Sequence, residues 1–238
     1  MKQKLIVSGC SLSDYTKVNI NYGEILSKTI NYDYIHLAAG CGSNERIWRV
    51  VTKQILNTTI TSNDTLVIQY TTQDRREFFS RHGYNDPPET ETSKFTPLRE
   101  TFKGGEIIKY KLDADTWQPF DEEKKFFKIY QDNFLSVEYN VEVFLQNHYR
   151  FLCLLAFYKI RTVFIESIYL HSGVDLLTPE HDEYIKSLST IDTKLFSNLN
   201  ICDLIETKHY QLSNDDPWHL NELGHEAVAD RLKTHLGT

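Results

Sequence analysis

Residues 4–11 of the chain read KLIVSGCS, a short aliphatic run that ends in a glycine and two small polar residues. A run of this length and composition, closed by a glycine, is typical of a buried strand and the turn after it. Similar runs follow at residues 34–38 (YIHLA), 65–70 (TLVIQY), 162–167 (TVFIES) and 201–205 (ICDLI). Helical patterns separate these runs, and such alternation predicts a parallel sheet covered by helices.

The helical patterns complete the predicted architecture. Residues 46–56 carry an apolar stripe, residues 129–159 form a longer helical segment, and residues 222–236 form a final amphipathic helix. We therefore predict a single three-layer α/β/α domain over residues 1–238, flavodoxin-like, with a mostly parallel five-stranded sheet.

Residues 75–128 interrupt this rhythm after the third predicted strand. The segment is charged, contains Gly104-Gly105, and is too long for an ordinary connection, so we predict an insertion with some structure of its own. Because open α/β sheets bind ligands at the carboxyl ends of their strands, the insertion is a candidate lid or substrate wall. The alternative is a surface elaboration without a functional role.

Composition excludes several classes of protein. The chain has 238 residues, 40% of them hydrophobic, which argues against a mainly disordered state. A net charge of −7 argues against nucleic-acid binding as the main activity. No run approaches the ~18 apolar residues of a membrane span, and the N-terminal residues do not resemble a secretory leader.

Cysteine and histidine spacing predicts neither a disulfide scaffold nor a metal site. The four cysteines form no CxxC pair, and the nine histidines include no HExxH motif. We expect a reduced, cytoplasmic protein without a bound metal. The sequence does not indicate an oligomeric state.

Ser11 is the first candidate catalytic residue. It lies in the turn directly after the first predicted strand, close to the start of the next helix. A serine at this place is exposed above the sheet, and nearby amides favour developing negative charge, which suits a nucleophile. The alternative is that Ser11 or Ser13 caps the following helix.

A second candidate segment lies near the C-terminus, where residues 215–225 read DDPWHLNELGH. Asp216 and His219 are three residues apart, so the carboxylate can hold the imidazole Nδ1 and leave Nε2 as a base. Asn221 is a candidate N-cap for the final helix. The alternative is an ordinary loop with a capping aspartate and a packed histidine.

Taken in chain order, these segments resemble the SGNH (GDSL-type) hydrolase superfamily. The family's G-D-S-L block corresponds to residues 9–12, with Cys10 at the place of the aspartate. Its C-terminal D-x-x-H block is intact in residues 216–219. The resemblance implies a serine esterase in which Ser11 is the nucleophile, His219 the base and Asp216 the residue that orients the histidine.

The resemblance also implies an oxyanion hole. Its donors would be the amide of Ser11 and that of Gly42, in the turn after the second strand, with Gly40 as the alternative register. Ser43 or Asn44 can cap the helix after this turn.

The family's third block, G-x-N-D, is not kept. Alignment of the block's aspartate with Asp74 places Gln73 where the family has its oxyanion-hole asparagine. Thr72, Gln69 or an arginine are alternatives for this donor. We assign Thr72, Asn44 and Trp218 to substrate binding.

The activity implied is cleavage of an ester through an acyl-enzyme without a cofactor. The substrate would carry an acetyl or other short acyl group on a carbohydrate or small molecule. Two alternatives remain: an O-acyltransferase with the same triad, and a catalytically inactive binding module.

Overall fold

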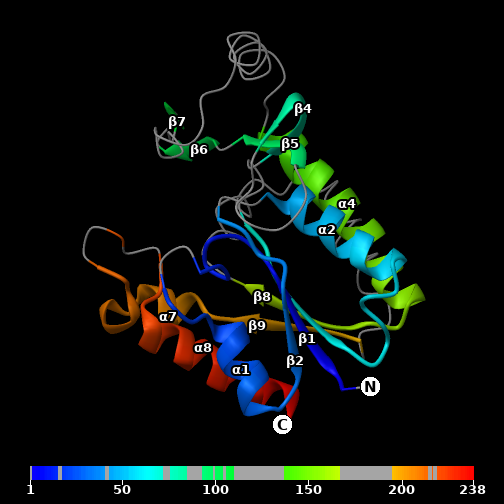
Figure 1. The fold of residues 1–238 in the computed structure, drawn as a ribbon. Helices are drawn as coiled ribbons and strands as arrows, with labels where there is room; N and C mark the ends of the chain where they lie inside the picture. The colour runs from blue at the N-terminus through cyan, green and yellow to red at the C-terminus, as the bar shows by residue number, and fades with distance from the viewer. Residues whose placement is uncertain are drawn as a thin grey trace.

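Five parallel strands form the central sheet of the protein, with the spatial order β2-β1-β3-β8-β9 (Figure 1). The computed structural model describes residues 2–15, 18–40, 43–71, 76–84, 93–98, 100–103, 106–109, 137–166, 195–213, 216 and 219–238. The sheet strands are β1 (Lys4–Ser8), β2 (Asp33–His36), β3 (Thr65–Gln69), β8 (Arg161–Glu166) and β9 (Phe196–Asn200). This order is the flavodoxin-like one, so the predicted fold class is confirmed, and every pairing is parallel.

Helices cover both faces of the sheet (Figure 1). One face carries α1 (Tyr22–Thr29), α7 (Cys202–Glu206) and α8 (Glu222–Leu236), and the other carries α2 (Asn44–Leu56) and α4 (Val137–Phe157). A short 3₁₀ turn, η2 (Lys208–Tyr210), precedes α8.

Alternate side chains of each strand enter the two cores. In β1, Leu5 and Val7 pack on the side of α1 and α8, whereas Ile6 packs on the side of α2 and α4. All three are fully buried, because a central parallel strand is covered on both faces.

The fifth predicted strand was wrong. Residues 202–206 form α7, and the edge strand is β9, immediately before them. The apolar residues Ile201, Leu204 and Ile205 are buried at helical spacing, i, i+3 and i+4. Strand β9 reads FSNLN and is partly exposed, so it lacks the apolar run expected of a strand.

The predicted insertion follows β3 and contains strands of its own. These are β4 (Arg76–Tyr84), β5 (Ser93–Leu98), β6 (Glu100–Lys103) and β7 (Glu106–Lys109). They form two antiparallel pairs, β4 with β5 and β6 with β7, separate from the main sheet. The proposed role as a lid remains a prediction.

Side-chain caps fix where the helices begin. Asn221 caps α8 by accepting from Gly224 N–H at 2.9 Å, as predicted. Ser43 caps α2, one of the two residues proposed for that place. Asn21 caps α1, so the alternative role of Ser11 or Ser13 as its N-cap is wrong.

Among the helices that the structure describes, none is both long and apolar enough to cross a membrane. The same residues include no group of three or more metal-ligating side chains able to hold an ion. Among the described residues, Cys10, Cys153 and Cys202 form no disulfide with one another.

Candidate active site

Ser11, His219 and Asp216 form a continuous hydrogen-bonded line. His219 Nδ1 lies 2.6 Å from Asp216 Oδ1, and His219 Nε2 lies 2.9 Å from Ser11 Oγ. Since a carboxylate only accepts, Nδ1 carries the ring proton and donates it to Asp216. Nε2 is then left as the acceptor for the hydroxyl of Ser11, which is the arrangement that a general base requires.

The sheet topology brings these residues together across 208 sequence positions. Ser11 lies in the loop after β1, at the carboxyl edge of the sheet, and His219 lies just before α8. Helices α1 and α8 lie side by side on the same face (Figure 1), and Tyr22 N–H of α1 donates to His225 Nδ1 of α8 at 3.2 Å. Two segments far apart in the sequence, around Ser11 and His219, therefore meet at this edge.

Gln69, the last residue of β3, anchors the turn that carries Ser11. Its Oε1 accepts from Cys10 N–H at 3.2 Å, lies 3.1 Å from the Cys10 thiol, and accepts from Ser13 Oγ at 3.3 Å. Cys10 N–H can only donate, so the oxygen of the amide must face it. Ser13 N–H also donates to Cys10 O at 2.9 Å, which closes the turn.

Gly9 allows this close packing. A Cβ at residue 9 would lie 2.6 Å from Ser13 Oγ, closer than real contacts permit, and 3.0 Å from Gln69 Cβ, which is tighter than most real contacts. Any side chain at this position would displace the turn from Gln69.

Two further buried residues, Tyr22 and His225, connect the serine turn to α8. Tyr22 OH lies 2.6 Å from Ser13 Oγ, and its ring stacks on that of His225 with centroids 5.9 Å apart. Burial, and then the charge of nearby His219, lowers the pKa of His225 to about 4. The neutral Nδ1 of His225 is consequently an acceptor at neutral pH.

Backbone hydrogen bonds hold the segment that carries His219. Leu212 N–H donates to His219 O at 2.8 Å, and Asn221 N–H donates to Tyr210 O at 2.8 Å. Gln211 and Leu220 form an antiparallel bridge between these two bonds. The side chain of Asn221 adds bonds from Nδ2 to His209 O and Gln211 O.

Comparison with known proteins gives matches only among solved structures. No protein-family model and no curated protein matches the chain. A carbohydrate esterase family 2 enzyme with a carbohydrate-binding domain, from Corynascus thermopiles, matches with a TM-score of 0.50 and 12% identity, over 100% of this chain and 68% of that one. The fold is SGNH-like.

Two other solved structures match at a TM-score of 0.49. One is the psychrotrophic esterase EstA from a Pseudoalteromonas species, 12% identical, over 99% of this chain and 100% of that one. The other is a member of the lipolytic G-D-S-L family from Veillonella parvula, which is 10% identical over 98% of this chain and 97% of that one. The property that this chain shares with its structural neighbours is the fold.

Two alternatives for the oxyanion hole of this SGNH-like fold are contradicted. Gly40 N–H donates to Asp14 Oδ2 at 2.7 Å, so this amide is already occupied. Gln69 is fully buried, its oxygen binds the serine turn and its Nε2 donates to Tyr70 O, so its side chain is engaged by the chain itself. Ser11 N–H makes no hydrogen bond to any residue that the structure describes.

Four of the predicted site residues lie outside the described residues: Gly42, Thr72, Gln73 and Trp218. Asn44 is described and is 3% exposed. Its side chain accepts from Thr71 N–H at 2.9 Å and donates to Thr71 O at 3.1 Å. Asn44 therefore ties the start of α2 to the end of β3, and its role in substrate binding remains a prediction.

The sequence did not indicate the anchoring role of Gln69, Tyr22 or His225. For Gln69 a signal was present, because it is the one polar side chain near the end of the apolar run TLVIQY. A buried amide in such a run must find partners, and the nearest are those of the neighbouring turn.

Proposed function

We propose that the protein is a serine ester hydrolase that acts through an acyl-enzyme. The observation that carries the proposal is the hydrogen-bonded line from Ser11 Oγ through His219 to Asp216. The SGNH-like fold, shared with the solved carbohydrate esterase, supports it.

In the first half of the reaction, Ser11 Oγ attacks the ester carbonyl while His219 Nε2 takes the hydroxyl proton. The imidazolium that forms is stabilised by the carboxylate of Asp216, which accepts from Nδ1–H. When the tetrahedral intermediate collapses, His219 returns the proton to the leaving alcohol and the acyl group stays on Ser11.

In the second half, a water molecule takes the place of the alcohol. His219 Nε2 removes its proton as it attacks the acyl carbonyl, and then protonates Ser11 Oγ as the carboxylic acid leaves. The enzyme returns to its initial protonation state, and the reaction consumes only ester and water.

The developing oxyanion needs hydrogen-bond donors near Ser11. We propose the N–H of Ser11 and of Gly42, with Gln73 as a third donor. Loss of one such donor costs a rate factor on the order of 10²–10³.

We propose an ester of an acetyl or other short acyl group, on a carbohydrate or a small molecule, as the substrate. The mechanism above requires no cofactor. A cytoplasmic location remains a prediction from the sequence.

The decisive experiment compares hydrolysis of p-nitrophenyl acetate by the wild type, Ser11→Ala and His219→Ala. His235→Ala, an exposed histidine on α8, is the matched control. We expect both triad variants to lose at least about 10³-fold in kcat, because the triad acts as a unit. Labelling of wild-type Ser11 by a fluorophosphonate, absent from Ser11→Ala, would identify the nucleophile independently.

Two outcomes would contradict this function. If the wild type neither reacts with the fluorophosphonate nor exceeds the triad variants, the protein is a binding module. If added alcohols are acylated in preference to water, it is an O-acyltransferase.

A further inference from the structure

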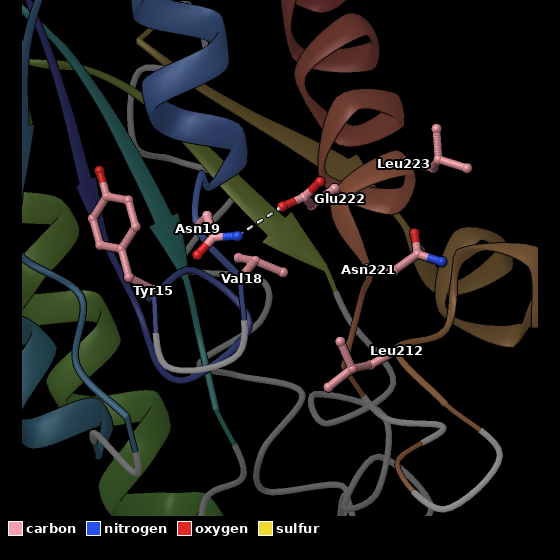
Figure 2. Close-up of a pocket in the computed structure, with 7 residues that line it drawn as sticks. All are labelled: Tyr15, Val18, Asn19, Leu212, Asn221, Glu222 and Leu223. Carbon is pink, nitrogen blue, oxygen red and sulfur yellow. Dashed lines mark hydrogen bonds between the residues drawn. The ribbon is translucent and has the colours of Figure 1, made fainter.

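A pocket of about 580 Å³ lies between the segment that follows Ser11 and the segment around His219 (Figure 2). One wall comes from the loop between β1 and α1, and the other from the segment around the start of α8. Its described lining residues are Tyr15, Val18, Asn19, Leu212, Asn221, Glu222 and Leu223. The volume is in the range of small-molecule binding sites.

Both walls of the pocket continue directly into the triad. The first wall belongs to the loop that begins at the serine turn, with Tyr15 four residues after Ser11. On the second wall, Leu212 N–H donates to His219 O at 2.8 Å. Asn221 is two residues after His219, which limits their Cα atoms to about 7 Å apart. A substrate with its carbonyl at Ser11 can therefore reach this pocket with its other end.

The polar groups of the pocket are mainly hydrogen-bond acceptors. Asn19 Nδ2 donates to Glu222 Oε1 at 3.3 Å, a bond that joins the two walls (Figure 2). This bond leaves Asn19 Oδ1 and Glu222 Oε2 as acceptors. The amide of Asn221 is used by the chain itself, since Oδ1 caps α8 and Nδ2 binds two carbonyls.

The rest of the lining is the ring of Tyr15 and the apolar side chains of Val18, Leu212 and Leu223. The Tyr15 hydroxyl donates to Glu24 Oε2 at 2.9 Å. A plain alkyl chain in this pocket would desolvate the Asn19 and Glu222 oxygens without replacing their hydrogen bonds, which is unfavourable. A ligand with hydroxyl donors on a carbon ring would satisfy both the acceptor oxygens and the apolar surface.

We propose that this pocket binds the alcohol portion of the ester, and that this portion is a polyhydroxylated ring whose hydroxyls donate to Asn19 and Glu222. The proposal rests on the ester hydrolase function proposed above. It makes Asn19 and Glu222 the residues that determine specificity for the alcohol.

The test compares two acetate esters of similar size, a monoacetate of methyl glucoside and cyclohexyl acetate. They differ in the ring hydroxyls, so the ratio of their kcat/KM values reports hydroxyl recognition. We expect the wild type to favour the sugar ester by at least about tenfold, the effect of one or two good hydrogen bonds. In Asn19→Leu and Glu222→Ala this ratio falls about tenfold, and Glu222→Gln, which keeps an acceptor, retains part of it.

Glu226→Ala is the matched control, because Glu226 is an exposed carboxylate one turn further along α8 and does not line the pocket. Its ratio should equal that of the wild type. Unfolding midpoints measured for all variants separate a specificity change from a folding defect.

The outcomes separate the two proposals. A wild type that cleaves neither these esters nor p-nitrophenyl acetate overturns the hydrolase function and the pocket assignment together, and one that cleaves only p-nitrophenyl acetate overturns the pocket assignment alone. A wild type that cleaves both esters with equal kcat/KM, or a ratio that Asn19→Leu and Glu222→Ala leave within twofold, overturns the pocket assignment alone.

Discussion

The two segments that meet at the candidate active site are held in different ways. The serine turn, residues 9–13, is anchored by side chains from elsewhere, chiefly the amide of Gln69 and the hydroxyl of Tyr22. The described part of the histidine segment, residues 210–213, 216 and 219–221, is held mainly by its backbone, through Leu212 N–H to His219 O and Asn221 N–H to Tyr210 O. One segment thus depends on distant side chains, and the other on local chain geometry.

This contrast predicts where the site is sensitive to substitution. A backbone hydrogen bond survives most changes of side chain, whereas a buried side-chain bond is lost with the residue that makes it. We therefore expect substitutions and low pH to disturb the serine turn more than the histidine segment.

The largest expected change in stability comes from lowering the pH. The contacts that hold the serine turn run through Tyr22 to His225, which is buried and can titrate. The pKa of His225 is about 4 in the fold, lowered by burial and by His219 from an ordinary value of 6.5. Between pH 6.5 and 4 the unfolded chain binds a proton that the folded one does not, so the unfolding free energy falls as the pH falls. The loss amounts to about 3 kcal/mol and levels off below pH 4.

Urea unfolding of the wild type and His225→Asn at pH 7.5 and 4.5 measures this loss. Asparagine can still offer an acceptor to Tyr22 N–H but does not titrate, so its unfolding free energy should vary less with pH. Identical pH dependence in the two proteins would show that His225 is not the acid-sensitive member.

Gln69→Leu comes next. The substitution leaves Cys10 N–H and Ser13 Oγ buried without the Gln69 acceptor, at a cost of about 2 kcal/mol in unfolding free energy. Because the turn moves Ser11 relative to His219, we expect kcat to fall more than tenfold with KM within twofold. Gln3→Leu, a surface glutamine beside β1, should change neither quantity. A loss of stability with full kcat would contradict the positioning role of Gln69.

Asn221→Ala should reduce kcat less than Gln69→Leu does. It removes the N-cap of α8 and the two Nδ2 bonds, about 1–2 kcal/mol in unfolding free energy. The backbone bonds around His219 remain, so kcat should fall by less than in Gln69→Leu. Calorimetric melting and steady-state kinetics measure both effects, with exposed Asn57→Ala as the control. A greater loss of kcat than in Gln69→Leu would reverse the contrast between the two segments.

Cys10→Ala should have the smallest effect, less than about 1 kcal/mol, because a thiol is a weak donor. The bond from Cys10 N–H to Gln69 does not depend on the side chain. Equal unfolding curves within this margin are expected. A loss as large as that of Gln69→Leu would assign the anchoring to the thiol.

The sequence predicted the strands and helices that have a clear pattern of apolar residues within their own short stretch of chain. The strands β1, β3 and β8 are apolar runs, and α8 has a capped amphipathic pattern, so each was found close to its observed bounds. Strand β9 was missed because an exposed edge strand has little apolar pattern, while the helix after it has more.

In the site, the order of short motifs indicated Ser11, Asp216 and His219 as partners, and the structure places them within hydrogen-bonding distance. The anchors Gln69 and Tyr22 could not be predicted in the same way. Their role arises from contacts between neighbouring strands and loops, which no spacing along the chain encodes.

The separation of 208 residues between Ser11 and His219 has a consequence for synthesis of the protein. During translation Ser11 emerges early, but its histidine follows only when almost all of the described chain has been made. Closing so long a loop is slow and requires the sheet to be in place first. A nascent or truncated chain thus holds Ser11 without His219, so we expect the hydrolase activity proposed above to appear only when α8 docks against α1.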